Sequence, residues 1–249
     1  MLTISSRFNG PPHSGNGGYV SGVLAQRFLD EFGDTPGAKV EVTLRKPPPL
    51  ETRLDLWVPE ETETLLLLDG SGEKPVLIAE AEAVEGSAGL IEAVPRGEAA
   101  VASESYMGAV EHPFPTCFVC GPEHPTGLHI FAGPVAGRRG VVAAPWSPEE
   151  DTAAPEFVWA ALDCVGGWSA GDLSGRPIVL GRMGVTPVAD RSELIPHAPY
   201  VVVGQHLHND GRKTFTSSTL YGPDGQAVAH ADAIWIAVDP TKVKPATTD

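Results

Sequence analysis

The chain has 249 residues, 42% of them hydrophobic, and carries 17 Lys and Arg against 32 Asp and Glu, a formal net charge of −15 at pH 7. This composition excludes a disordered chain, and the length allows one large domain or two ordinary ones. Strong negative charge without clustered Lys and Arg argues against nucleic-acid binding. No long apolar run and no leader-like N-terminus is present, so we expect neither a membrane span nor secretion. Three cysteines cannot all pair within one chain, which favours a reducing, cytoplasmic setting.

The first part of the chain predicts one helix followed by strands. A short alternating segment (Leu2, Ile4) leads into a loop rich in Gly and Pro over 8–18. Apolar residues spaced three and four apart then predict a helix over 19–32 that stops before Gly33. Beyond it the apolar period falls to two, which predicts antiparallel strands at 40–44, 54–56, 65–68 and 76–84.

The second part repeats this order after a segment without periodicity. Residues 94–116 are rich in Pro, Glu, Ala and Ser and predict a linker. A second helix is predicted over 155–165, because Pro155 suits the first position of a helix and Glu156 suits its positive end. Alternating segments predict strands at 128–131, 141–144, 185–188, 200–207, 215–220 and 228–238.

The last hairpins of the two parts can be superimposed as sequences. Ala79-Glu80-Ala81-Glu82-Ala83 follows one Gly-rich turn, and Ala229-His230-Ala231-Asp232-Ala233 follows the other. A repeat of this length indicates duplicated domains. We therefore predict an α+β protein with an N-terminal domain at 1–95, a linker at 96–116, a C-terminal domain at 117–240 and a tail at 241–249.

The second predicted helix contains one carboxylate, Asp163, among apolar and small residues. A helix that is apolar on all sides is buried, and burying an unpaired carboxylate costs several kcal/mol. Asp163 is therefore a candidate catalytic residue. The alternative is that Asp163 bonds to backbone amides near Gly166-Gly167 at the helix end.

The start of the first helix offers a complementary group. Asn16-Gly17-Gly18 precedes Tyr19, and glycine at a helix N-terminus lets backbone N–H groups approach an incoming oxygen. Such donors stabilise the oxyanion that forms during acyl transfer.

Together these segments resemble the hotdog-fold acyl-CoA thioesterases, in the form in which two hotdogs are fused in one chain. Gly17-Gly18-Tyr19-Val20-Ser21-Gly22-Val23-Leu24 is similar to the helix start of double-hotdog thioesterases. Cys117-Phe118-Val119-Cys120-Gly121, followed by Thr126-Gly127-Leu128, is similar to the entry strand of another hotdog branch, whose catalytic Asp corresponds to Asp163.

The resemblance implies a double hotdog with one composite site for an acyl thioester such as an acyl-CoA, and no cofactor beyond that substrate. N–H groups near Gly17 and Gly18 would polarise the carbonyl, and Asp163 would act as general base or nucleophile. Asn16 would help to hold the carbonyl or the water. Further candidate substrate-binding residues are His13, Tyr19, Gln26 and Trp159; Gln26 stands near the position of the missing carboxylate of the first helix.

Other functions are also considered. A non-catalytic acyl-CoA-binding protein has the same fold and is the main alternative. Ser169 lies in a G-x-S-x-G pattern, but a serine hydrolase needs a strand before it. Cys117-x-x-Cys120 with His124 and Cys164 suggests zinc, yet the second pair of a strong motif is missing, so we expect no metal. Hotdog dehydratases are disfavoured because no short Asp and His motif surrounds Asp163. A homodimer is as compatible with the sequence as a monomer.

Overall fold

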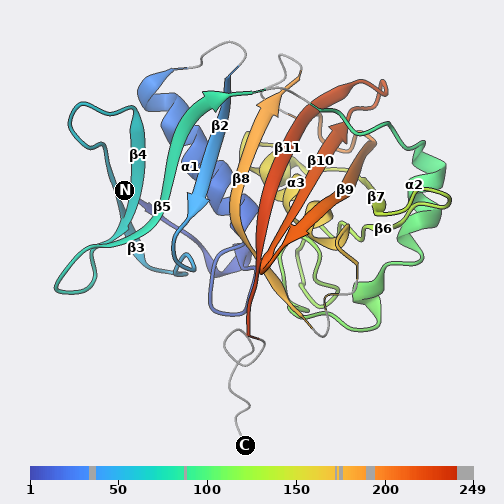
Figure 1. The fold of residues 1–249 in the computed structure, drawn as a ribbon, viewed down its shortest axis with the longest axis horizontal. Helices are drawn as coiled ribbons and strands as arrows, with labels where there is room; N and C mark the ends of the chain where they lie inside the picture. The colour runs from blue at the N-terminus through green and yellow to red at the C-terminus, as the bar shows by residue number, and fades with distance from the viewer. Residues whose placement is uncertain (34–37, 87–88, 172, 174–175, 189–193, 240–249) are drawn as a thin grey trace, which may run out of the picture.

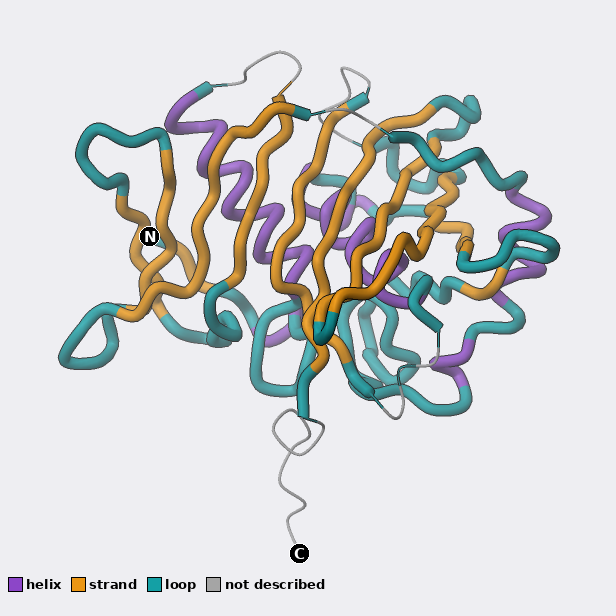
Figure 2. Tube along the Cα trace, in the orientation of Figure 1, coloured by secondary structure: helices purple, strands orange, loops and turns teal. Residues whose placement is uncertain are grey.

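The computed structural model describes residues 1–33, 38–86, 89–171, 173, 176–188 and 194–239. One curved antiparallel sheet runs across the molecule, and two long helices lie side by side against one of its faces (Figures 1 and 2). The strand order is β1-β3-β4-β5-β2-β8-β11-β10-β9-β7-β6, so each half of the chain supplies one side of the sheet. The predicted tail at 241–249 lies outside the described residues.

The N-terminal half consists of a helix and the strands that curve around it. Helix α1 spans Gly17–Phe32; Asn16 caps its start, where the Asn16 Oδ1 accepts the Tyr19 N–H at 2.9 Å. The helix ends at Gly33, whose φ of 81° is the left-handed conformation that glycine adopts without strain. The strands are β1 (Leu2–Thr3), β2 (Ala38–Leu44), β3 (Arg53–Trp57), β4 (Thr64–Asp69) and β5 (Val76–Glu85).

The C-terminal half repeats this arrangement around α3, which spans Pro155–Trp168. Every residue from Phe157 to Trp168 is buried, as expected for a helix that is apolar on all sides. The strands are β6 (Gly133–Pro134), β7 (Val141–Trp146), β8 (Ile178–Pro187), β9 (Tyr200–Asp210), β10 (Lys213–Tyr221) and β11 (Ala227–Ala237). Short 3-10 helices lie at Ser6–Phe8, Met107–Ala109 and Glu150–Thr152.

The two halves join where β2 pairs with β8. The pairing is antiparallel, with Val42 opposite Met183, and it makes the sheet continuous across the duplication. Both of these side chains are fully buried under the helices. The seam therefore brings α1 and α3 into contact at the middle of the sheet.

The segment between the halves differs from the predicted linker. Helix α2 (Arg96–Ser103) forms there, and its buried Ala99 and Ala102 pack with Val141 and Ala143 of β7. Neighbouring residues of β7 point to α3 instead, so α2 covers the opposite face of the sheet. The segment predicted as a linker thus contains a helix that the local pattern did not indicate, because two small residues, one helical turn apart, are sufficient to dock a short helix.

The predicted strand at 128–131 was also wrong. Leu128 and Ile130 donate their N–H groups to the Phe118 and Val119 carbonyls, at 2.7 and 2.9 Å, and so bind a loop rather than the sheet. None of the helices in the described residues has the length and hydropathy that crossing a bilayer requires.

Glycines let the two long helices approach closely. A Cβ on Gly18 would lie 2.3 Å from the Cβ of Asp163, and one on Gly22 would lie 2.8 Å from the Cα of Glu156. Real Cβ atoms do not approach so closely, so both positions require glycine. The start of α1 thus lies directly against the carboxylate in α3.

Candidate active site

Asp163 is buried between the two helices and is held by groups from the other half of the chain. Asp163 is only 2% exposed to solvent. Its Oδ2 accepts the Gly18 N–H at 2.9 Å and an Asn16 Nδ2 hydrogen at 3.2 Å. The amides that satisfy the carboxylate are therefore those of α1, and not those near Gly166-Gly167 at its own helix end.

The second carboxylate oxygen, Asp163 Oδ1, is buried and has no hydrogen-bond partner among the described residues. Burial raises the pKa of Asp163 from 3.8 to about 7, because desolvation penalises the charged form. The Gly18 and Asn16 hydrogen bonds act in the opposite direction, since they stabilise the carboxylate. A carboxyl group with a pKa near neutrality and one unpaired oxygen is typical of catalytic sites.

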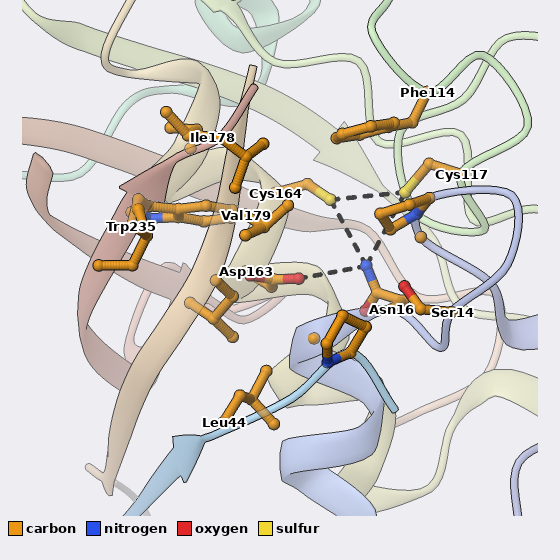
Figure 3. Close-up of a pocket in the computed structure, with 18 of the residues that line it drawn as sticks. Ser14, Asn16, Leu44, Phe114, Cys117, Asp163, Cys164, Ile178, Val179 and Trp235 are labelled. Atoms are coloured by element: carbon orange, nitrogen blue, oxygen red, sulfur yellow. Dashed lines mark hydrogen bonds between the residues drawn. The ribbon is translucent and has the colours of Figure 1, made fainter. Parts of the chain in front are cut away.

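A cavity of about 450 Å³ opens beside this carboxylate. Figure 3 shows Asp163, Asn16 and Cys164 at its centre, with Ile178, Val179 and Trp235 on one side and Phe114 on the other. Its apolar wall is formed by the side chains of Leu44, Phe114, Trp168, Leu173, Ile178, Val179, Leu180, Trp235, Ile236 and Val238. The exposed Arg45 and Lys46 lie at its rim.

Three of the predicted site residues besides Asp163 line this cavity: His13, Asn16 and Gly17. Gly18 is used differently from the prediction, because its N–H already donates to Asp163 and so orients the carboxylate. No acceptor for the Gly17 N–H is present among the described residues. Gly17 is therefore the backbone donor that remains available to a ligand.

Tyr19, Trp159 and Gln26 are not among the residues that line the cavity. Tyr19 stacks on Phe8, with ring centroids 4.0 Å apart, and belongs to an aromatic cluster with Phe118 and Phe157. The backbone of Trp159 packs against Gly18, where a Cβ would lie 2.8 Å from its carbonyl oxygen.

Gln26 does not hold the position equivalent to Asp163. Asp163 is the ninth residue of α3, and the ninth residue of α1 is Ala25, which is buried. A count that starts at Gly18 gives Gln26, but α1 begins one residue earlier, at Gly17. Gln26 therefore lies one position past the equivalent site and is partly exposed.

Ser169 does not have the environment of a catalytic serine. It follows helix α3 instead of a strand, and its Oγ donates to the Gly166 carbonyl at 2.6 Å, which closes the end of the helix. Ser169 is also absent from the cavity that contains Asp163. These contacts explain the serine as a helix-ending residue.

The wall of the cavity could not be found from the sequence. Leu44, Ile178 and Trp235 lie on three different strands, and only the sheet topology brings them together. Each was visible only as an apolar residue in an apolar segment, a pattern that the ordinary core shares.

No protein-family model matches this sequence, and no curated protein matches it. Solved structures do. A hotdog-fold protein of unknown function from Alicyclobacillus acidocaldarius shares 11% identity, with a TM-score of 0.51 over 95% of this chain and 92% of that one. The chain has the hotdog fold.

Two further solved structures match this chain over nearly its full length, and their names indicate different activities. One, provisionally named a thioesterase, is from Novosphingobium aromaticivorans: 10% identity and a TM-score of 0.59, over 96% of this chain and 94% of that one. The other is the dehydratase domain of PpsC from Mycobacterium tuberculosis, in complex with C12:1-CoA: 16% identity and a TM-score of 0.57, over 90% and 85%. This double hotdog thus shares its architecture with proteins of both names.

Proposed function

We propose that this double hotdog hydrolyses acyl thioesters, with Asp163 as the general base. The observation that carries the proposal is the pairing across the two halves. Gly18 and Asn16 fix Oδ2 of Asp163, while Oδ1 has no partner among the described residues and the side chain faces the cavity. A carboxylate held by one oxygen can accept a water proton on the other.

In the proposed reaction, Oδ1 takes a proton from water as the water oxygen bonds to the carbonyl carbon. The tetrahedral intermediate then collapses and the C–S bond breaks. The departing thiolate takes the proton back from Asp163, so the carboxylate is regenerated. The products are a carboxylic acid and a thiol.

The developing oxyanion needs a hydrogen-bond donor, and the start of α1 supplies one. Gly17 lines the cavity, and its N–H lies at the positive end of the helix dipole. One such donor is worth about 10²–10³ in rate. The Gly17 N–H and the Asp163 carboxylate thus come from different halves, so the site requires both.

The shape and charge of the cavity favour an apolar acyl group on an anionic carrier. Trp168 and Trp235 contribute to its apolar wall, and Arg45 and Lys46 lie at its rim. Arg45 is already paired with Glu80, which leaves Lys46 as the cation for a carrier phosphate. The acyl-CoA bound to the PpsC domain supports an acyl-CoA as the substrate here.

Hydrolysis of a panel of acyl-CoAs of different chain length, followed by loss of thioester absorbance, tests this function. Asp163→Asn keeps the shape of the side chain and is expected to lower kcat by about 10²–10⁴-fold. Asp210→Asn makes the same charge change at an exposed position of β9 and should leave the rate unchanged. Full activity in Asp163→Asn, or tight acyl-CoA binding without turnover in the native protein, would overturn the proposal.

One observation favours a second candidate, dehydration of 3-hydroxyacyl thioesters. His13 from the N-terminal half lines the same cavity as Asp163 from the C-terminal half. His13 would remove the proton next to the carbonyl, and Asp163 would protonate the departing hydroxyl as the C–O bond breaks. If this is the activity, His13→Ala abolishes enoyl thioester formation; if hydrolysis is the activity, His13→Ala leaves thioester loss intact.

A further inference from the structure

The three cysteines of the chain meet at one point in the structure. Cys117, Cys120 and Cys164 are all free and buried, and their three Sγ atoms lie within 4.8 Å of one another. Two of them precede the second half's sheet and the third follows Asp163 on α3. The sequence suggested Cys164 as a further partner of Cys117-x-x-Cys120, and the fold brings the three sulfurs together.

The spacing of the sulfurs matches that of zinc ligands. Cys117 Sγ lies 3.8 Å from Cys164 Sγ (Figure 3). In a tetrahedral site with zinc–sulfur bonds of about 2.3 Å, neighbouring sulfurs are about 3.8 Å apart. The pair therefore already has the separation that a shared metal ion requires.

The first two thiols, Cys117 and Cys120, lie on one tight turn. Gly121 donates its N–H to the Cys117 carbonyl at 2.8 Å, and a Cβ on Gly121 would lie 2.4 Å from the Cys117 nitrogen.

Side-chain N–H groups face the same sulfurs. Asn16 Nδ2 lies 3.8 Å from both Cys117 Sγ and Cys164 Sγ. His112 Nε2 lies 3.4 Å from Cys120 Sγ, and His112 Nδ1 accepts the Phe114 N–H at 2.8 Å. Because Nδ1 is an acceptor, the ring proton is on Nε2 and points to Cys120. His112 thus acts as a donor to sulfur, as partners of metal ligands do, and not as a ligand.

His124, the histidine that the sequence placed nearest to the cysteines, is engaged elsewhere. Its Nε2 bonds the Arg7 carbonyl at 2.8 Å and its Nδ1 accepts the Thr126 N–H at 3.2 Å. The sulfurs therefore face one another, the donors around them and the cavity, which all three cysteines line.

We propose that Cys117, Cys120 and Cys164 together bind one thiophilic divalent cation, of which zinc is the type, with its fourth position open to the cavity. Three thiolates supply soft ligands that zinc prefers over Mg²⁺ or Ca²⁺. The ion ties the 117–121 turn to α3 and so fixes the cavity wall beside Asp163. This proposal does not rest on the proposed hydrolysis, because metal binding alone tests it.

Cobalt(II) titration of the full-length protein, reduced and freed of metal by a chelator, tests the site. One equivalent of Co²⁺ should give thiolate-to-cobalt charge transfer in the near ultraviolet and the intense visible bands of a tetrahedral ion, and one equivalent of Zn²⁺ should remove both. Cys164→Ser should weaken Co²⁺ affinity by more than about 100-fold, since even partners of ligands are worth 10–100-fold. His124→Ala, as the matched histidine control, should leave the cobalt spectrum unchanged.

A second measurement does not depend on variants that fold. Zinc should protect all three thiols of the native protein from alkylation, while circular dichroism confirms the same fold with and without the metal. No uptake of Co²⁺, a cobalt spectrum without thiolate charge transfer, or equal alkylation with and without zinc overturns the proposal. Loss of thioester hydrolysis with normal cobalt binding would count against the proposed function and leave this site intact.

Discussion

Replacing Gly18 by alanine tests whether the position of the Asp163 carboxylate controls activity. A Cβ at Gly18 would lie 2.3 Å from the Asp163 Cβ and 2.9 Å from its Cγ. Ordinary contact needs about 3.4 Å or more, so the carboxylate must move by roughly 1 Å. A misplacement of about 1 Å costs about 100-fold in rate, so Gly18→Ala should lower kcat by about that factor.

Gly22→Ala provides the matched control, because it disturbs the same helix contact one turn away. Its Cβ would lie 2.8 Å from the Glu156 backbone, and its three nearest atoms belong to Glu156 and Trp159 instead of Asp163. Overpacking lowers the unfolding free energy by about 1–3 kcal/mol. The higher helix propensity of alanine relative to glycine raises it by about 1 kcal/mol. Both variants should therefore lose up to about 2 kcal/mol of unfolding free energy, a Tm decrease of about 2–4 °C per kcal/mol.

The two measurements together separate stability from site geometry. In thermal melts, Gly18→Ala and Gly22→Ala should have similar Tm values. In steady-state kinetics, only Gly18→Ala should show the large loss of kcat. Gly97→Ala, where an added Cβ would have no neighbour within 4 Å, should keep both the Tm and the activity. Equal activity in Gly18→Ala and Gly22→Ala would refute the reasoning that the first turn of α1 orients the base.

Four further variants test three separate contacts of the site. Asn16→Asp keeps an oxygen to cap Tyr19 but places a second buried carboxylate beside Oδ2 of Asp163, so both the Tm and kcat should fall. Asn16→Ala removes the cap and the donor without adding a charge, so it should lose about 1 kcal/mol of unfolding free energy in urea denaturation and lower kcat as well. Lys46→Ala should raise KM for an acyl-CoA, an effect that added salt reduces, and should not change KM for a thioester without phosphates; an equal rise for both would exclude a phosphate contact. Ser169→Ala should leave kcat unchanged, and an inactive, folded Ser169→Ala protein would restore the serine hydrolase hypothesis.

The fold was largely predictable because its signals are local. The helical spacing before Gly33 and the all-apolar run around Asp163 both correspond to observed helices, and alternation located most strands. The helix within 94–116, which the pattern did not indicate, and the wrongly predicted strand at 128–131 both lie in segments held by contacts distant in sequence. Ala99 becomes part of a helix because β7 lies beneath it, and that information is not in the local pattern.

The site was predictable to the extent that its chemistry conflicts with its surroundings. A single acid in an apolar helix signals function whatever the fold, and a glycine pair at a helix start signals close approach. The sequence could not show that Gly18 would bond to Asp163 instead of facing a ligand, because that depends on how α1 and α3 cross. It grouped Cys164 with Cys117 and Cys120 but could not show that the three sulfurs meet, for the same reason.

The duplication leaves one site of this kind instead of two, and the helices show why. The second residue of α1 is Gly18 and the ninth residue of α3 is Asp163; the reciprocal positions hold Glu156 in α3 and Ala25 in α1. Ala25 supplies no carboxylate, and Glu156 places a side chain where the N–H approach requires glycine. Restoring symmetry with Ala25→Asp alone would bury a second carboxylate without the Gly18-like amide that holds the first. We expect this variant to lose several kcal/mol of unfolding free energy and to gain no second site, because such a site needs both members of the pair.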